Sequence, residues 1–160
     1  MVNPSMLKTG LTKIDPLRAK LKSDAYLGFD FGNKKIGVAV GYAETGIASP
    51  LLTLPAVKQH PDWPRIGQLI DEWRPAGLVV GLSRNLDGGD NPITPLMEKF
   101  CRQLKGRYNL PVHQMDETLT TFAAKQLLFD EVRVSAGKLW QVQDQVAAQL
   151  ILQSWFNQAN

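Results

Sequence analysis

The spacing of apolar residues changes part-way along the chain, and this change limits the folds that are open to it. Between Tyr26 and Leu54, apolar residues fill three short segments, YLGFDF, KKIGVAVGY and SPLLTL, with only short turns between them. Such neighbouring segments predict strands that pair antiparallel. From Pro64 onward, segments with helical spacing alternate with short apolar runs, which predicts strands joined by helices.

The later segments complete the predicted order. In PRIGQLIDEW, apolar residues recur every three or four positions, as on an amphipathic helix. The apolar runs GLVVGL and PVHQM predict two further strands. Helices are expected over about 94–107, at TTFAAKQLLF and over about 139–156. The order β-β-β-α-β-α-β-α-α predicts an α/β fold in which helices flank a mixed five-stranded sheet.

The chain has the length of one ordinary domain, preceded by a different kind of segment. Residues 1–24 contain five lysines and arginines, and Pro4 and Pro16 would interrupt any long helix. We therefore expect a loosely ordered basic extension, followed by a folded domain over 25–160. The extension is either a solvated tail or an arm that helps to bind a nucleic-acid backbone.

Charge and composition exclude some classes of protein. A net charge of +3 permits nucleic-acid binding without demonstrating it. No apolar run is long enough to cross a bilayer and no secretory signal is recognisable, so a cytoplasmic protein is expected. Cys101 is the single cysteine, which excludes an intrachain disulfide, and it reads as a small packed residue. His60 and His113 have no partners at metal-ligand spacing, and both are interpreted as structural or surface residues.

Asp30 is an acid inside an otherwise apolar strand. It stands between Phe29 and Phe31, where burying a carboxylate without a partner is costly. Strand alternation places it on the same face as Gly28 and Gly32. We expect these glycines to leave room beside the carboxylate for an ion or a phosphate. The alternative is an aspartate that caps a turn at the end of the strand.

Two further acidic positions stand out. Asp116 and Glu117 follow PVHQM directly, at the carboxyl end of a strand, where α/β sheets bind ligands. The alternative is that they only complement the dipole of the next helix. Asp144 interrupts the apolar face of the last helix, close to the small residues Ala147 and Ala148. It is therefore either buried and paired, or it faces a polar site.

Together, these acids predict a metal site. Asp30, Glu117 and Asp144 would repel one another strongly if they met without cations to neutralise them. Carboxylate oxygens select Mg²⁺ or Mn²⁺ over zinc. Two such ions about 4 Å apart activate a water and stabilise the leaving oxygen of a phosphodiester. The pattern therefore indicates a metal-dependent nuclease.

Four segments, DFGNKKIGVAVG, GLVVGLSRNLDGG, DETLTT and QDQVAAQLIL, resemble the motifs of the YqgF family, in the same order, over Tyr26–Phe156. Members of this family are described as candidate Holliday-junction resolvases of the RNase H superfamily. They are also described as nucleases that mature the precursor of the small-subunit ribosomal RNA. The resemblance implies the RNase H-like fold, metal-dependent cleavage of phosphodiester bonds and a cytoplasmic location.

The resemblance also implies roles for particular residues. Asp30, Glu117 and Asp144 match the acids of the family's motifs and would be both catalytic and metal-binding, with Asp116 and Gly32 in support. The loop that contains Asn85, Asp87 and Gly88 matches a glycine-rich loop expected to approach the substrate backbone, although a surface turn is the alternative. The chain departs from the family at Thr118, where arginine is usual, at Asn33, where threonine is more usual, and at Lys35, where arginine is common.

Three cations complete the candidate site. We expect Lys34, Lys35 and Arg84 to bind backbone phosphates; the alternative is that they belong to the solvated surface.

The predicted function is a nuclease that acts on structured nucleic acid in ribosomal RNA maturation. The alternatives are a Holliday-junction resolvase, a non-catalytic nucleic-acid-binding module, or a phosphate-handling ATPase. The ATPase needs two related lobes, for which a single domain without a repeat has no room. Junction cutting requires a dimer, and the sequence leaves monomer and homodimer open.

Overall fold

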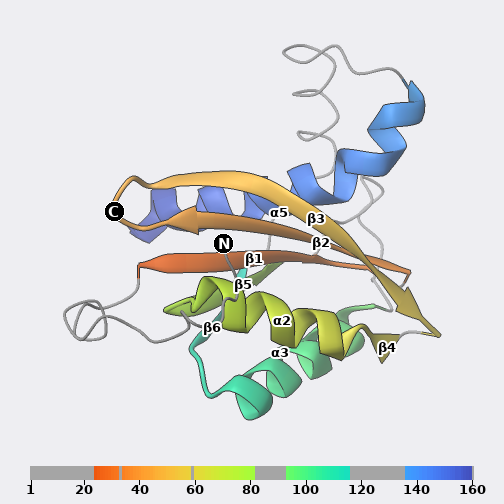
Figure 1. Ribbon diagram of the computed structural model, residues 1–160, viewed down its shortest axis with the longest axis horizontal. Coiled ribbons are helices and arrows are strands. Elements are labelled where there is room, and N and C mark those ends of the chain that lie inside the picture. The colour runs from red at the N-terminus through yellow and green to blue at the C-terminus, as the bar shows by residue number, and fades with distance from the viewer. Residues whose placement is uncertain (1–23, 33, 59, 82–92, 116–135, 160) are drawn as a thin grey trace, which may run out of the picture.

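The computed structural model describes residues 24–32, 34–58, 60–81, 93–115 and 136–159, with side chains over 143–158 in the last range. The described elements are drawn in Figure 1. In chain order they are β1 (Ala25–Phe31), β2 (Lys35–Tyr42), β3 (Ile47–Val57), β4 (His60–Pro61), α2 (Trp63–Trp73), β5 (Gly77–Gly81), α3 (Thr94–Tyr108), β6 (Val112–Met115) and α5 (Ala136–Ala159).

The strands form one mixed sheet in the order β4-β3-β2-β1-β5-β6. The pairs β1–β2 and β2–β3 are antiparallel, whereas β5 runs parallel to β1 and β6 runs parallel to β5. The predicted α/β class and the predicted mixture of pairings are therefore confirmed. The expected number of five strands is wrong, because the two-residue strand β4 adds a sixth beside Ala56 and Val57. A strand this short carries no periodic pattern that a sequence could reveal.

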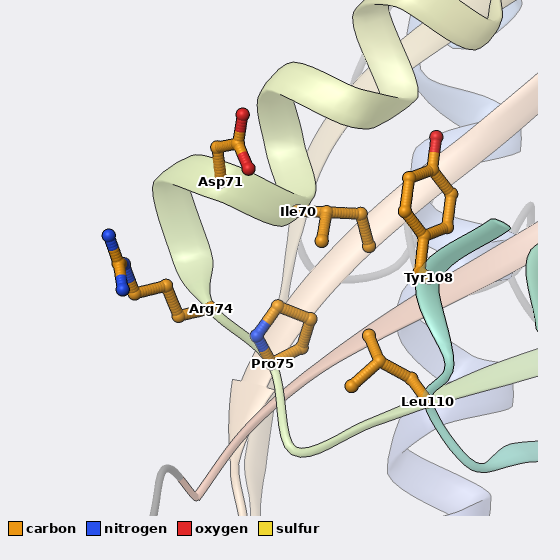
Figure 2. A pocket seen from close by; sticks show the side chains of 6 residues that line it. All are labelled: Ile70, Asp71, Arg74, Pro75, Tyr108 and Leu110. Atoms are coloured by element: carbon orange, nitrogen blue, oxygen red, sulfur yellow. The ribbon is translucent and has the colours of Figure 1, made fainter.

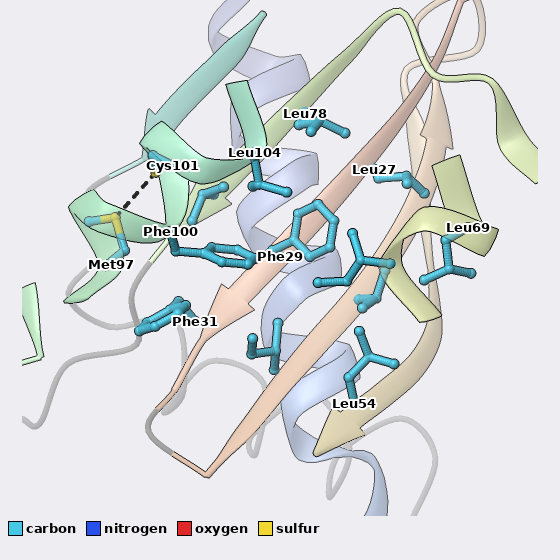
Figure 3. Packing of buried hydrophobic residues seen from close by; sticks show 14 of the residues in the cluster. Leu27, Phe29, Phe31, Leu54, Leu69, Leu78, Met97, Phe100, Cys101 and Leu104 are labelled. Atoms are coloured by element: carbon cyan, nitrogen blue, oxygen red, sulfur yellow. Dashed lines mark hydrogen bonds between the residues drawn. The ribbon is translucent and has the colours of Figure 1, made fainter. Parts of the chain in front are cut away.

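Helices cover both faces of this sheet (Figure 1). One face packs against α2 and α3, and its main contributors from β1 are Leu27, Phe29 and Phe31. Figure 3 shows these side chains pointing toward the helices, where the rings of Phe29 and Phe100 meet edge to face at 5.7 Å. The alternate residues of β1, among them Gly28 and Asp30, therefore face the other side, which α5 covers.

The α5 face of the sheet consists largely of small residues, so the helix lies very close to it. A Cβ atom placed on Gly28 would lie 2.8 Å from the Cβ of Leu152 and 3.2 Å from the carbonyl oxygen of Ala148. One placed on Gly32 would lie 2.6 Å from the carbonyl oxygen of Lys35. The space over Gly28 is therefore occupied by α5, and the space over Gly32 is occupied by the backbone of Lys35.

The predicted helix positions agree closely with those observed. The first helix begins at Trp63 rather than Pro64, and the second ends at Tyr108 rather than Arg107. The last helix, α5, extends over Ala136–Ala159. The helix expected at TTFAAKQLLF lies outside the described residues, as does nearly all of the basic extension. Within the part of the chain that is described, no helix is long and apolar enough to span a membrane.

Candidate active site

Asp30 is the only buried charged residue in the described part of the chain, with 5% of its surface exposed. It lies near the end of β1, opposite Gly37 of β2 on one side and Gly81 of β5 on the other. Residues that are directly opposite in a sheet point to the same face. The Asp30 side chain therefore projects toward α5 and is flanked by two glycines that have no side chains of their own.

Asp144 approaches the same place from the helix. A Cβ atom placed on Gly37 would lie 3.0 Å from the Asp144 Cβ, and nearer still to the carbonyl group of Asp144. Side chains on directly opposite strand residues have Cβ atoms about 5 Å apart. The Cβ atoms of Asp30 and Asp144 are therefore within about 8 Å of each other. Two acids that are 114 positions apart in the sequence thus converge around one glycine.

The charge on Asp144 is set by two opposing effects. Burial of the carboxyl raises its pKa above the ordinary value, and the positive charge of Lys35 lowers it in part. Lys35 lies two residues before Gly37 on β2, and strand alternation places both on the α5 face. Lys35 is exposed, so an exposed cation lies near the carboxylate of Asp144.

Asp30 belongs to a row of residues that runs across five strands. Met115, Gly81, Asp30, Gly37 and Thr53 are successive partners on β6, β5, β1, β2 and β3. Both β5 and β6 end at this row. Their carboxyl ends therefore coincide with the level of the acidic pair, at the edge where ligands bind in such sheets.

Several predicted site residues follow directly after these strand ends. Asp116 and Glu117 come after Met115 of β6, and Arg84 and Asn85 come shortly after Gly81 of β5. All four lie outside the described residues, together with Asp87, Gly88 and Thr118. Among the residues that are described, no group of three His, Cys, Asp or Glu side chains could hold a metal ion. Two of the three predicted ligands are nevertheless brought together.

Three other residues considered in the sequence lie away from the acidic pair or take no part in it. Lys34 is exposed, and its carbonyl oxygen accepts a hydrogen bond of 2.8 Å from the Ala56 amide. Cys101 is buried and donates a hydrogen bond of 3.6 Å to the Met97 sulfur (Figure 3). Burial of the thiol is the main reason why its pKa rises to about 11, which confirms a packed residue rather than a nucleophile. The His113 ring stacks on Trp155 at 4.8 Å.

Sequence reasoning missed Gly37 and Gly81, the two glycines that flank Asp30. A signal was present for Gly37, because small residues alternate in β2 as Gly37, Ala39 and Gly41, whereas Val79 interrupts such a pattern between Gly77 and Gly81 of β5. A period of two in small residues indicates a strand face on which another element lies unusually close. The alternation alone does not show that Asp30 lies between those two strands.

A shallow pocket lies elsewhere, at the other end of the sheet. Figure 2 shows its lining by Ile70, Asp71, Arg74, Pro75, Tyr108 and Leu110. Pro75 and Leu110 come just before β5 and β6 begin, whereas the row that contains Asp30 is where those strands end. This pocket is therefore separate from the acidic pair.

Comparison with known proteins assigns the chain to a family. A family model described as RuvX, Holliday junction resolvase, matches residues 24–158 of the chain. The chain belongs to the RuvX family. This confirms the resemblance to the YqgF family, which is the same group. It also confirms the predicted class of enzyme, a nuclease that hydrolyses phosphodiester bonds.

Individual relatives agree with this assignment. A protein of Methylococcus capsulatus is 52% identical over 139 residues, which cover 87% of this chain and 92% of that protein. A protein of Pseudomonas putida is 47% identical over 133 residues, which cover 81% and 92% of the two chains. Both relatives carry the name "Putative pre-16S rRNA nuclease".

A solved structure supports the fold of the RuvX-family chain. The RuvC protein of T. thermophilus, in complex with a Holliday junction substrate, matches with a TM-score of 0.50. The match covers 84% of this chain and 94% of that protein, at 15% sequence identity. This likeness shows a shared fold, in agreement with the RNase H-like architecture predicted from the sequence.

Proposed function

We propose that this RuvX-family protein is a divalent-metal-dependent nuclease that processes the precursor of 16S ribosomal RNA in the cytoplasm. The observation that carries the proposal is the convergence of two acids at Gly37: Asp30 lies beside this glycine in the sheet, and Asp144 packs over it from α5. The relatives named as pre-16S rRNA nucleases support the choice of substrate, since they match most of the chain at about half identity.

The acidic pair fits a divalent cation. Asp30 is almost fully buried, and burial raises the pKa of Asp144. Two carboxylates this close and this shielded repel each other when both are ionised, and a cation between them removes that cost. Their hard oxygen atoms suit Mg²⁺ or Mn²⁺. We propose that Asp30, Asp144 and Glu117 hold the metal, with Asp116 and Gly32 in support.

The bound cations would supply a water of lowered pKa and would stabilise the charge on the leaving oxygen. The chain itself fixes the geometry. Asp30 is anchored in the central strand β1, between β2 and β5, and the flanking glycines leave space for α5 to pack closely against the sheet. A carboxylate held this firmly keeps its position while the reaction proceeds.

The cations near the site are proposed to bind the substrate backbone. Lys34 and Lys35 are both exposed; Lys35 is the first residue of β2, the strand that carries Gly37, and Lys34 directly precedes it. Exposed lysines contribute to nucleic-acid binding chiefly through phosphate contacts, which set the register of the substrate without reading its sequence. Arg84 and Asn85, after β5, are proposed to act in the same way.

Cleavage assays test the proposal directly. We expect Mg²⁺ or Mn²⁺ to support cleavage of an RNA that contains the ends of the 16S precursor. Asp30→Asn should abolish cleavage, because it keeps the shape of the side chain and removes its charge. Asp71→Asn, at an exposed position of α2, is the matched control and should retain the parent activity. Full cleavage in EDTA, or full activity of Asp30→Asn, would contradict the proposal.

The alternative substrate is a four-way DNA junction. The description of the RuvX family as resolvases favours it. Resolution of a junction requires two symmetric incisions, and therefore a dimer with a two-fold axis. The same assay distinguishes the substrates when junction DNA and linear duplex DNA are included, with the oligomeric state measured by light scattering. Paired cuts in the junction by a dimer, with the RNA left intact, would establish the alternative.

A further inference from the structure

Thr53 lies beside the acidic pair, and the proposed function gives it no role. It is the partner of Gly37 on β3, so Gly37 stands between Thr53 and Asp30 in the row across the sheet. Directly opposite residues point to the same face. The Thr53 side chain therefore projects toward α5, whereas its neighbour Leu54 is buried in the core on the opposite face.

The Thr53 hydroxyl is buried without a hydrogen bond. Its oxygen is shielded from solvent and has no partner among the residues that the structure describes. Leaving a buried hydroxyl unpaired is costly, and valine would fill nearly the same space in a strand without that cost. Among the described residues, one other buried side-chain atom lacks a hydrogen-bond partner, the indole nitrogen of Trp73. Trp73 is on α2, across the sheet from Asp144. Thr53 is thus the unpaired group on the acidic side.

Asp144 is the acidic residue that this hydroxyl can reach. The Asp144 Cβ lies 3.0 Å from the position that a Gly37 Cβ would take, and the Thr53 Cβ is about 5 Å from that same position. The two side chains are therefore within about 8 Å, Cβ to Cβ. Since glycine has no side chain, nothing from residue 37 stands between them.

We propose that Thr53 is a positioning residue whose hydroxyl donates a hydrogen bond, directly or through one water, to the Asp144 carboxylate oxygen that does not bind the cation. The proposal rests on the metal site proposed above. Carboxylates that bind metals use one oxygen for the ion and need donors for the other, and these outer partners fix the orientation of the ligand.

Calorimetric titration of Mn²⁺ into the full-length protein tests this inference. Thr53→Val keeps the shape of the side chain and removes the donor, so we expect Mn²⁺ binding to weaken about tenfold. Thr53→Ser keeps the donor and should restore binding to near the parent affinity. The metal-free melting temperature of Thr53→Val should be equal to or above that of the parent, because an unpaired buried hydroxyl has been removed. Thr53→Ala removes the same hydroxyl and replaces Thr53→Val if that variant does not fold.

Thr45→Val is the matched control, since Thr45 is an exposed threonine in the turn at the opposite end of β2 and β3. It should bind Mn²⁺ as the parent does. Equal Mn²⁺ affinity for the parent and the variants without the hydroxyl would overturn the role of Thr53 alone. Equal losses in Thr53→Ser and Thr53→Val would also overturn it, because the hydroxyl would not be the cause. A parent that binds no Mn²⁺ would overturn the proposed function together with this inference.

Discussion

Gly37 controls how closely the two acids approach each other. Any side chain at this position would collide with the backbone of Asp144, and a backbone group cannot rotate away as a side-chain end can. The strand would have to bend or the first half of α5 would have to lift. Either movement separates Asp144 from Asp30. The glycine therefore contributes to the site through the space that it leaves for the helix.

Gly37→Ala is expected to destabilise the fold and weaken the metal site. Forcing an extra methyl group into a close-packed region costs about 1–3 kcal/mol of unfolding free energy, and displacement of Asp144 should reduce Mn²⁺ affinity. Urea denaturation and calorimetry measure the two effects. Gly106→Ala is the control, because a Cβ placed there in α3 would have no atom within 4 Å apart from its own neighbours and the adjacent helix backbone. The control should gain about 1 kcal/mol from the higher helix propensity of alanine. Equal stability of the two variants would contradict this reading of Gly37.

The raised pKa of Asp144 predicts how the stability of the folded protein depends on pH. Burial raises the pKa of this carboxyl in the folded protein, even though Lys35 opposes the shift. Folding therefore favours the protonated form, and the ionised form destabilises the folded state when the pH is above the folded pKa. The penalty disappears below the ordinary aspartate pKa of about 3.9, where the carboxyl is protonated in both states.

Without metal, Asp144→Asn should therefore melt at a higher temperature than the parent at neutral pH. The difference should shrink as the pH falls and should vanish below about pH 3.9. Melting curves of both proteins in EDTA across this range provide the measurement. A difference that grows toward acid pH would mean that the carboxylate is stabilised by folding, contrary to the direction of its pKa.

At the scale of elements, α5 covers the sheet and also protects the edge of β3. Since β4 pairs with β3 only at Ala56 and Val57, most of β3 is an outer edge. Gln153 accepts a hydrogen bond of 3.0 Å from the Ala48 amide and donates one of 2.7 Å to the Gly46 carbonyl oxygen. Gln149 donates one of 3.1 Å to the Ala48 carbonyl oxygen. These side chains occupy backbone groups that another strand could otherwise bind.

Replacing Gln149 and Gln153 together by alanine is expected to lower the free energy of unfolding by about 1–3 kcal/mol, since three partly buried hydrogen bonds are lost. Urea denaturation measures this change. Gln68→Ala is the control, because it removes one exposed hydrogen bond to Arg65 on α2 and should cost no more than about 0.5 kcal/mol. A double variant as stable as this control would show that the glutamines do not hold the helix to the edge.

The sequence predicted most elements because their patterns are long and periodic. Ile66 and Leu69 in α2, and Phe100 and Leu104 in α3, repeat with the helical period and are all buried. The close packing of α5 on the glycines was not predictable in the same way. It depends on which strands become neighbours, and nothing local to Gly81 in the sequence shows that it will lie beside Asp30.

For the whole molecule, the order of strands decides where the site is. β1 lies inside the sheet with β2 and β5 as neighbours, so Asp30 is held by pairing on both sides. From the sequence, Asp30 and Asp144 could be chosen because each interrupts an apolar pattern. Their meeting point could not, since it requires the crossing of α5 over β2 at Gly37. The sequence therefore singled out two acids that the fold brings together, but it did not reveal the glycines and the helix that surround them.

A cation that binds only the folded molecule should stabilise the whole domain. At a free Mn²⁺ concentration of about 100 times Kd, the expected gain is about 2.7 kcal/mol. For a domain of this size, that gain corresponds to a rise in Tm of about 5–10 °C. EDTA should return the parent to its metal-free Tm. Asp30→Asn should show little or no rise, because one of the converging carboxylates has lost its charge, whereas Asp71→Asn should respond as the parent does. A rise of equal size in Asp30→Asn would place the cation elsewhere in the molecule and would separate metal binding from the acidic pair.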